Sequence, residues 1–104
     1  MYKPLPKSLM IKGSDIEGQG LFATEPIAAE TALGITHVKA KNAENQYWRT
    51  PLGGFINHSD IPNCIKKENR FTDNLYLETI KDIDGGEELT VRYTLYELEK
   101  KNEI

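Results

Sequence analysis

The chain has 104 residues, of which 38% are hydrophobic and 28% are charged, and this predicts one globular domain with a modest core. Its formal net charge of −3 argues against a general nucleic-acid binder, and no apolar run is long enough to cross a bilayer. The opening stretch, MYKPLPKSLMIK, carries no secretory signal, so we expect a cytoplasmic protein. The single cysteine, Cys64, excludes an internal disulfide and a cysteine-rich zinc site.

The first half of the chain predicts short strands separated by loops. Two prolines at alternate positions favour an extended arm over residues 1–7. The predicted strands are residues 8–12, 21–24 and 31–38. Gly34 interrupts the last of them, and three glycines mark residues 13–20 as a loop. The polar segment 39–50 fits either a helical turn or an ordered loop, and its pattern does not decide between them.

The second half continues this pattern and ends in a helix. PLGG at 51–54 predicts a turn, and so does the acidic, glycine-containing segment 82–88. The predicted strands are residues 64–68, 75–79 and 89–93. Residues 94–101 predict a helix, with Thr94 as N-cap and Glu97 completing a capping box. The sum is a mostly β domain, and local pattern alone does not identify its function.

Three segments carry a more specific signal when they are taken together. They are Gly18–Ala23 (GQGLFA), Phe55–Cys64 (FINHSDIPNC) and Gly86–Tyr93 (GEELTVRY). The glycine pair alone is weak evidence because such pairs occur in many turns, whereas the run from Phe55 to Cys64 is highly specific. In this order the three segments resemble the SET-domain protein lysine methyltransferases, and the resemblance spans roughly residues 8–96.

The resemblance implies a SET-like fold of small curved sheets with a knot-like C-terminal crossing and a short C-terminal helix. It divides the chain into an N-terminal arm (1–7), a SET-like domain (8–96) and a C-terminal helical tail (97–104). It also implies that S-adenosylmethionine is the cofactor and that a lysine of a protein or peptide is the substrate. The two would enter from opposite faces and meet in a narrow channel.

The cofactor-binding residues implied by the resemblance come from two of the segments. Glu17, Gly18 and Gln19 form a loop whose backbone can approach a ligand closely, although the same glycines could simply form a turn. Asn57 has both a donor and an acceptor, and could hold the amino-acid part of the cofactor. His58 would contact the cofactor, or would be a histidine with satisfied nitrogens that orders the crossing loop.

Two tyrosines complete the predicted site. Tyr93 is the candidate catalytic residue, because its hydroxyl could orient a neutral lysine amine behind the methyl group; its alternative role is an aromatic residue of the core. Tyr93 is also counted among the cofactor contacts, and Tyr96 could cover the adenine or pack in the core. We expect no metal, because the spacing of the histidine, cysteine and aspartate side chains matches no usual zinc pattern.

Departures from the family pattern leave an alternative function open. Gly54 and Arg92 stand where relatives often carry arginine and aspartate, and the segment between Ile27 and Phe55 is short. These features are compatible with a degenerate SET module that binds a partner without catalysis. They also suggest that a homodimer could complete the peptide groove. The expected partners are a protein substrate, with histones as one plausible class, and neither nucleic acid nor membrane.

Overall fold

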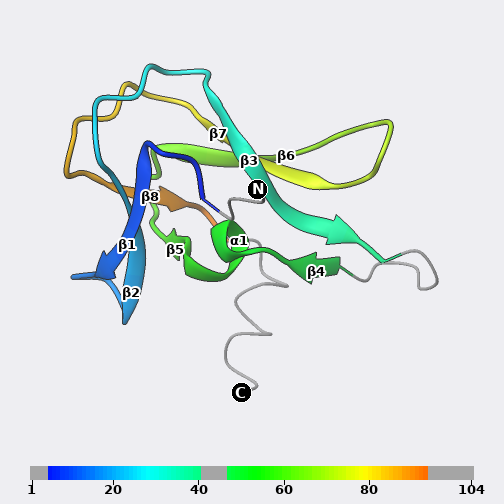
Figure 1. Cartoon of the computed structure of the whole chain (residues 1–104), viewed down its shortest axis with the longest axis horizontal. Coiled ribbons are helices and arrows are strands. Elements are labelled where there is room, and N and C mark those ends of the chain that lie inside the picture. The colour runs from blue at the N-terminus through cyan, green and yellow to red at the C-terminus, as the bar shows by residue number, and fades with distance from the viewer. Residues whose placement is uncertain (1–4, 41–46, 94–104) are drawn as a thin grey trace.

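The computed structural model describes residues 5–40 and 47–93, and this part of the chain is built mainly from short strands (Figure 1). In chain order the elements are β1 (Leu9–Gly13), β2 (Gln19–Ala23), β3 (Ala32–Lys39), β4 (Tyr47–Arg49), α1 (Pro51–Phe55), β5 (Asn57–His58), β6 (Cys64–Glu68), β7 (Leu75–Thr79) and β8 (Glu88–Val91). The mostly β class with small sheets, as predicted from the sequence, is confirmed.

The first sheet brings together the segments that the sequence analysis singles out. Its strand order is β1-β2-β8-β5, and its neighbours are antiparallel except for β5 and β8. In this parallel pair Asn57 lies opposite Thr90 and His58 lies opposite Val91. Parallel strands need a long crossover connection, and here the connection contains β6 and β7. The pairing therefore places the Asn-His segment directly beside the C-terminal tyrosine segment.

The second sheet has the order β4-β3-β7-β6 and is antiparallel throughout. The strands predicted at 64–68 and 75–79 coincide with β6 and β7. Gly34, the predicted interruption, has a φ of 144° and lies at a register shift between β3 and β7, so it forms a bulge. The undecided segment 39–50 contributes β4, and its residues 41–46 lie outside the described residues.

Residues 51–54, predicted as a turn, instead begin the short helix α1, which corrects that prediction. Pro51 occupies the first turn, where its missing N–H costs nothing. Thr50 is the N-cap, and its hydroxyl accepts a hydrogen bond from the Gly53 N–H at 3.4 Å. A Cβ added at Gly53 would clash with the carbonyl of Thr36 in β3. The proline and glycines that suggested a turn thus belong to a capped helical turn pressed against the second sheet.

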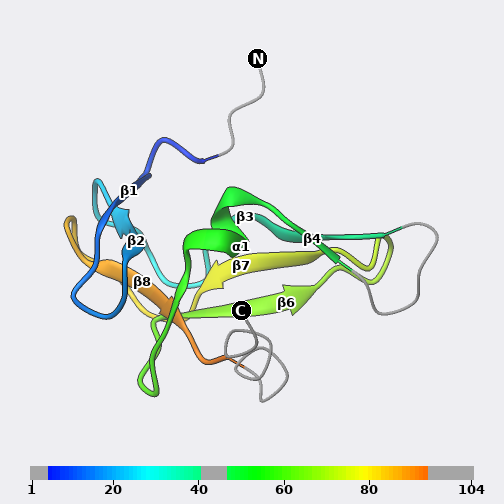
Figure 2. The same cartoon turned by 90° about the horizontal axis from the view of Figure 1, so that it is seen from below.

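A single core joins the two sheets, which lie side by side with α1 near their junction (Figure 2). The helix contacts β2 of the first sheet and β3 of the second. The largest fully buried apolar side chains come from both sheets, from α1 and from the loop before β8: Leu21, Leu52, Leu77, Ile83, Leu89 and Val91. Because this core is shared, the position of the first sheet depends on the packing of the second.

Two other expectations concern the ends of the elements. The strand predicted at 89–93 is observed as β8, which ends at Val91. The helix predicted at 94–101 lies outside the described residues. Within the described part of the chain, no helix is long and apolar enough to span a bilayer.

Truncating the core should destabilise the whole domain. Leu77 is completely buried, and Leu77→Ala should lower the free energy of unfolding by about 2–5 kcal/mol, because it removes apolar contacts and leaves a cavity. Urea unfolding followed by circular dichroism measures the change. Phe71→Ala is the matched control, because this side chain is 98% exposed and its loss should change stability by less than about 0.5 kcal/mol. Equal effects of the two substitutions would contradict the described core.

Candidate active site

The glycine loop between β1 and β2 is a tight, exposed connection. The Ser14 N–H donates to the Gly18 carbonyl at 2.9 Å, which closes the loop. Gly18 has a φ of 48°, in the left-handed region that favours glycine. The Ser14 hydroxyl also accepts from the Ile16 N–H at 3.0 Å. Glu17, Gly18 and Gln19, all predicted as cofactor contacts, are therefore held together at the surface of one compact turn.

Asn57 connects this loop to the strands behind it. The residue is 5% exposed, and its Nδ2 lies 3.2 Å from the carbonyl oxygens of both Glu17 and Gln19. The same Nδ2 lies 3.1 Å from the Ser14 hydroxyl and 2.9 Å from Oε2 of Glu88. The two amide hydrogens are thus shared among acceptors from the loop and from β8. This side chain fixes the loop against the parallel pair of β5 and β8.

The carbonyl end of the Asn57 side chain has a different environment. All the hydrogen bonds of this side chain to described residues run through Nδ2. Within the described part of the chain, no buried side-chain oxygen or nitrogen lacks a partner. Oδ1 therefore makes no hydrogen bond to the described residues. An uncommitted acceptor at this place can receive a hydrogen bond from a ligand.

Glu88 and Ser14 form a part of the site that the sequence analysis did not identify. The Ser14 hydroxyl lies 2.8 Å from Oε1 and 2.9 Å from Oε2 of Glu88. Gly20 leaves room for this carboxylate, since a Cβ at position 20 would clash with Oε2. The signal in the sequence was the acidic pair in GEELTVRY, but only the sheet register shows that Glu88 faces the glycine loop.

His58 has a structural role for its side chain. Its Nδ1 accepts a hydrogen bond from the Tyr93 backbone N–H at 2.8 Å, so that nitrogen carries no proton. Its Nε2 lies 3.1 Å from Oδ1 of Asp60, and donates to it. Both ring nitrogens are therefore occupied within the protein. Of the two roles that the sequence left open, the contacts of the side chain support the one in which His58 orders the crossing.

Tyr93 lies at the end of the first sheet and points back toward β5. Its hydroxyl donates to the Ile56 carbonyl oxygen at 2.6 Å, and its ring lies 5.2 Å from that of His58. Arg92 is directed elsewhere, because its Nη2 donates to the Asp60 carbonyl at 2.8 Å. Tyr96, predicted to cover the adenine, lies outside the described residues. Tyr93 thus binds both Ile56 and His58, the two neighbours of Asn57 in the chain.

Two neighbouring residues support the site without taking part in its chemistry. Asn63 is buried, accepts from the Thr90 N–H at 2.8 Å and donates to the Glu88 carbonyl at 2.8 Å, so it clamps β8 in place. Cys64 is buried as well. Desolvation and the negative charge of Glu87 raise the pKa of its thiol to about 12, which keeps it protonated and unreactive at neutral pH.

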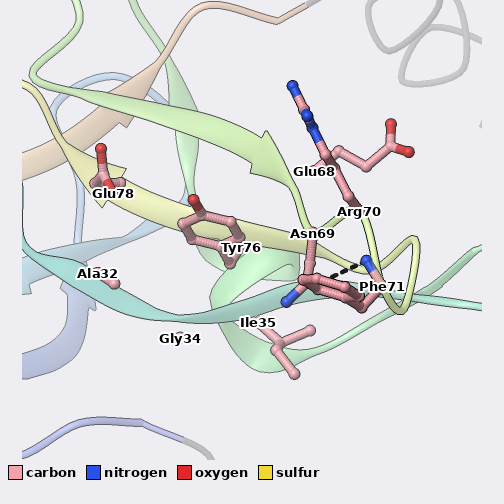
Figure 3. Close-up of a pocket in the computed structure, with 9 residues that line it drawn as sticks. All are labelled: Ala32, Gly34, Ile35, Glu68, Asn69, Arg70, Phe71, Tyr76 and Glu78. Carbon is pink, nitrogen blue, oxygen red and sulfur yellow. Dashed lines mark hydrogen bonds between the residues drawn. The ribbon is translucent and has the colours of Figure 1, made fainter.

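Two hollows lie at different places on the surface of the described residues. One borders Tyr93 and has mainly apolar walls, formed by Pro62, Cys64, Ile65, Ile80 and Val91 together with Lys66 and Arg92. The other lies on the second sheet near the β6–β7 hairpin, and its lining includes Ile35, Tyr76 and the exposed Phe71 (Figure 3). Of the predicted site residues that the structure describes, none lines this second hollow. The geometry therefore separates it from the convergence around Asn57.

Comparison with known proteins shows which family the chain is similar to. The family model of the SET domain matches residues 35–94. A curated relative from Schizosaccharomyces pombe, named histone-lysine N-methyltransferase, H3 lysine-37 specific, is 32% identical over an alignment 109 positions long. The match covers 82% of this chain and 72% of that protein.

Solved structures share the fold at lower identity. The methyltransferase domain of human PR domain-containing protein 2 matches with a TM-score of 0.68 and 23% identity, over 86% of this chain and 79% of that one. A humanized mutant of Chaetomium thermophilum Polycomb Repressive Complex 2 matches with a TM-score of 0.68 and 23% identity, over 84% of this chain and 15% of that one. At such identities these matches show a common fold.

The contact between Gly20 and Glu88 predicts a sharp difference between two glycine substitutions. Gly20→Ala should lower the free energy of unfolding by about 1–3 kcal/mol, because the new methyl group displaces the carboxylate that Ser14 and Asn57 bind. Gly13→Ala, in the neighbouring strand, meets no atom within 4 Å and is the control. Urea unfolding of both variants measures the difference. A Gly20→Ala protein as stable as the Gly13→Ala protein would contradict the described packing.

Proposed function

The chain belongs to the SET-domain family of protein lysine methyltransferases, and from this premise we propose that it uses S-adenosylmethionine to methylate a lysine side chain of a protein. The observation that carries the proposal is the convergence on segment 56–58. Asn57 binds the glycine loop there, while the Tyr93 hydroxyl binds the Ile56 carbonyl at 2.6 Å. Residues far apart in sequence are thus brought together at this segment.

The residues around Asn57 fit the proposed cofactor. Oδ1 of Asn57 would offer an acceptor for an ammonium group. The loop Glu17–Gln19 is exposed, and Gly18 has no side chain that would block the approach of a ligand. When bound, S-adenosylmethionine supplies a methyl group activated by the positively charged sulfur. The protein's contribution is to hold the loop rigid, through Asn57 and Glu88, so that the cofactor meets a preformed surface.

Tyr93 would act on the substrate lysine. A free lysine has a pKa near 10.4, so producing the neutral amine at pH 7.4 costs about 4 kcal/mol. Apolar walls beside Tyr93 would lower that pKa by desolvation, and so reduce the cost. Because the Tyr93 hydroxyl donates its proton to the Ile56 carbonyl, its oxygen can accept an N–H from the amine and orient it. His58 helps to position Tyr93, because its Nδ1 accepts a hydrogen bond from the backbone N–H of Tyr93.

The proposed substrate class is taken from the name of the curated relative from Schizosaccharomyces pombe. That protein is named for lysine 37 of histone H3. We therefore propose histone H3 and its peptides as the first substrates to test. The homodimer that would complete a peptide groove stays a prediction, since the structure contains one chain.

Replacing Tyr93 by phenylalanine tests the function. Tyr93→Phe should reduce kcat by about 100-fold or more, because the hydroxyl that orients the amine is lost. Binding of S-adenosylmethionine should change little. Mass spectrometry of histone H3 after incubation with isotope-labelled cofactor measures methyl transfer, and calorimetry measures binding.

The control for this experiment is Tyr76→Phe, on β7 and away from Asn57. It should keep wild-type activity. A Tyr93→Phe protein with full activity would contradict the role of the hydroxyl. A wild-type protein that binds no S-adenosylmethionine would instead favour the non-catalytic SET module.

A further inference from the structure

We propose that Glu88 makes the cofactor site discriminate between the cationic S-adenosylmethionine and its neutral product, S-adenosylhomocysteine. The inference rests on the proposed function and adds a residue that determines specificity for that same site. At neutral pH, S-adenosylmethionine carries a net charge of +1, from its sulfonium, ammonium and carboxylate groups. S-adenosylhomocysteine lacks the sulfonium charge and is a neutral zwitterion. A fixed negative charge near the site therefore favours the binding of S-adenosylmethionine over that of S-adenosylhomocysteine.

The Glu88 carboxylate is held in one position behind the glycine loop. Ser14 donates to it at 2.8 Å, and Asn57 Nδ2 lies 2.9 Å from Oε2. Gly20 lies against the same oxygen, where a larger residue would not fit. The side chain is partly buried, so water screens its charge less than that of a fully exposed group. This arrangement keeps a negative charge at a defined place.

The groups that bind Glu88 do not neutralise it. The hydroxyl of Ser14 and the amide of Asn57 are both uncharged donors. The ion pairs found among the described residues join His58 to Asp60 and Lys67 to Glu78, and neither involves Glu88. A partly buried carboxylate that has no cationic partner among residues 5–40 and 47–93 favours the binding of a positive charge beside it. A bound cation would supply that charge.

The carboxylate lies directly behind the surface that would bind the cofactor. Only the amide group of Asn57 separates Oε2 of Glu88 from a ligand held by Oδ1. The carbonyl oxygens of Glu17 and Gln19 face the same Nδ2, so they surround this position with further negative partial charge. The field at the site therefore favours cations, and it acts on the whole ligand rather than on one hydrogen bond.

This charge would matter at the end of the reaction. Methyl transfer breaks the sulfur–methyl bond and forms a nitrogen–methyl bond, and the sulfur keeps the bonding electron pair. The positive charge thereby moves to the lysine nitrogen, which then loses a proton to water. The attraction between Glu88 and the nucleoside disappears at that moment, and this favours release of the product.

Calorimetry on the Glu88→Gln protein tests the inference. Glutamine has nearly the same shape, and its carbonyl oxygen can still accept from Ser14 and Asn57, while the charge is removed. The ratio of the Kd for S-adenosylhomocysteine to the Kd for S-adenosylmethionine should fall about threefold to tenfold relative to wild type. Most of the change should lie in the Kd for S-adenosylmethionine.

Two control variants separate charge from structure. Ser14→Ala removes a hydrogen bond but leaves the carboxylate. It should therefore raise the Kd for both ligands by the same factor and leave the ratio of the two Kd values unchanged. Glu68→Gln changes the net charge equally at an exposed position on β6, and should leave both Kd values unchanged. In the wild-type protein the ratio should also fall as NaCl rises from about 20 mM to about 500 mM, because salt screens the carboxylate. This last measurement does not depend on the folding of any variant.

Each outcome bears on a different statement. A ratio that is the same in wild type and Glu88→Gln, and that does not respond to salt, would overturn the inference and leave the proposed function intact. A wild-type protein that binds neither nucleoside would overturn the proposed function and the inference with it.

Discussion

The side-chain amide of Asn57 is the interaction on which the site depends. It is buried, and its Nδ2 lies within hydrogen-bonding distance of two loop carbonyls, a serine hydroxyl and a carboxylate. The loop supplies no hydrophobic anchor of its own, since its residues 15–19 are exposed. Its conformation therefore depends on polar contacts, and losing the amide would remove the donor that joins the loop to Ser14 and Glu88, whose side chains are partly buried. Rigid placement of the loop is what would make it a binding surface.

The topology brings this amide to its partners. β5 contains only two residues, yet it pairs in parallel with β8 and so fixes Asn57 beside the strand that carries Glu88. The same pairing continues along the chain, where His58 accepts from the backbone of Tyr93. One short parallel contact thus controls the loop at one end and the candidate catalytic tyrosine at the other. The core shared by both sheets holds this contact in place.

The sequence predicted those elements whose structure is determined by residues close together in the chain. The two short segments on either side of a polar loop were identified as strands, and β6 and β7 have the predicted bounds. The capped turn of α1 was misread because proline and glycine are common to turns and helix starts. No periodicity could reveal β5, which is too short to alternate. The grouping of the glycine loop with Asn57 came from motif order. Ser14 and Glu88 are 74 positions apart, and their contact depends on sheet register, which sequence pattern does not specify.

The most direct test follows the amide resonances of isotope-labelled protein while S-adenosylmethionine is added. The side-chain amide of Asn57 lies between the loop and Glu88, so its two signals should shift together with the backbone amides of Gly18 and Gln19. All of these signals should saturate at one ligand concentration. Shifts confined to the hollow around Phe71 and Tyr76, with the Asn57 signals unchanged, would show that the ligand binds elsewhere and that Asn57 does not organise the site.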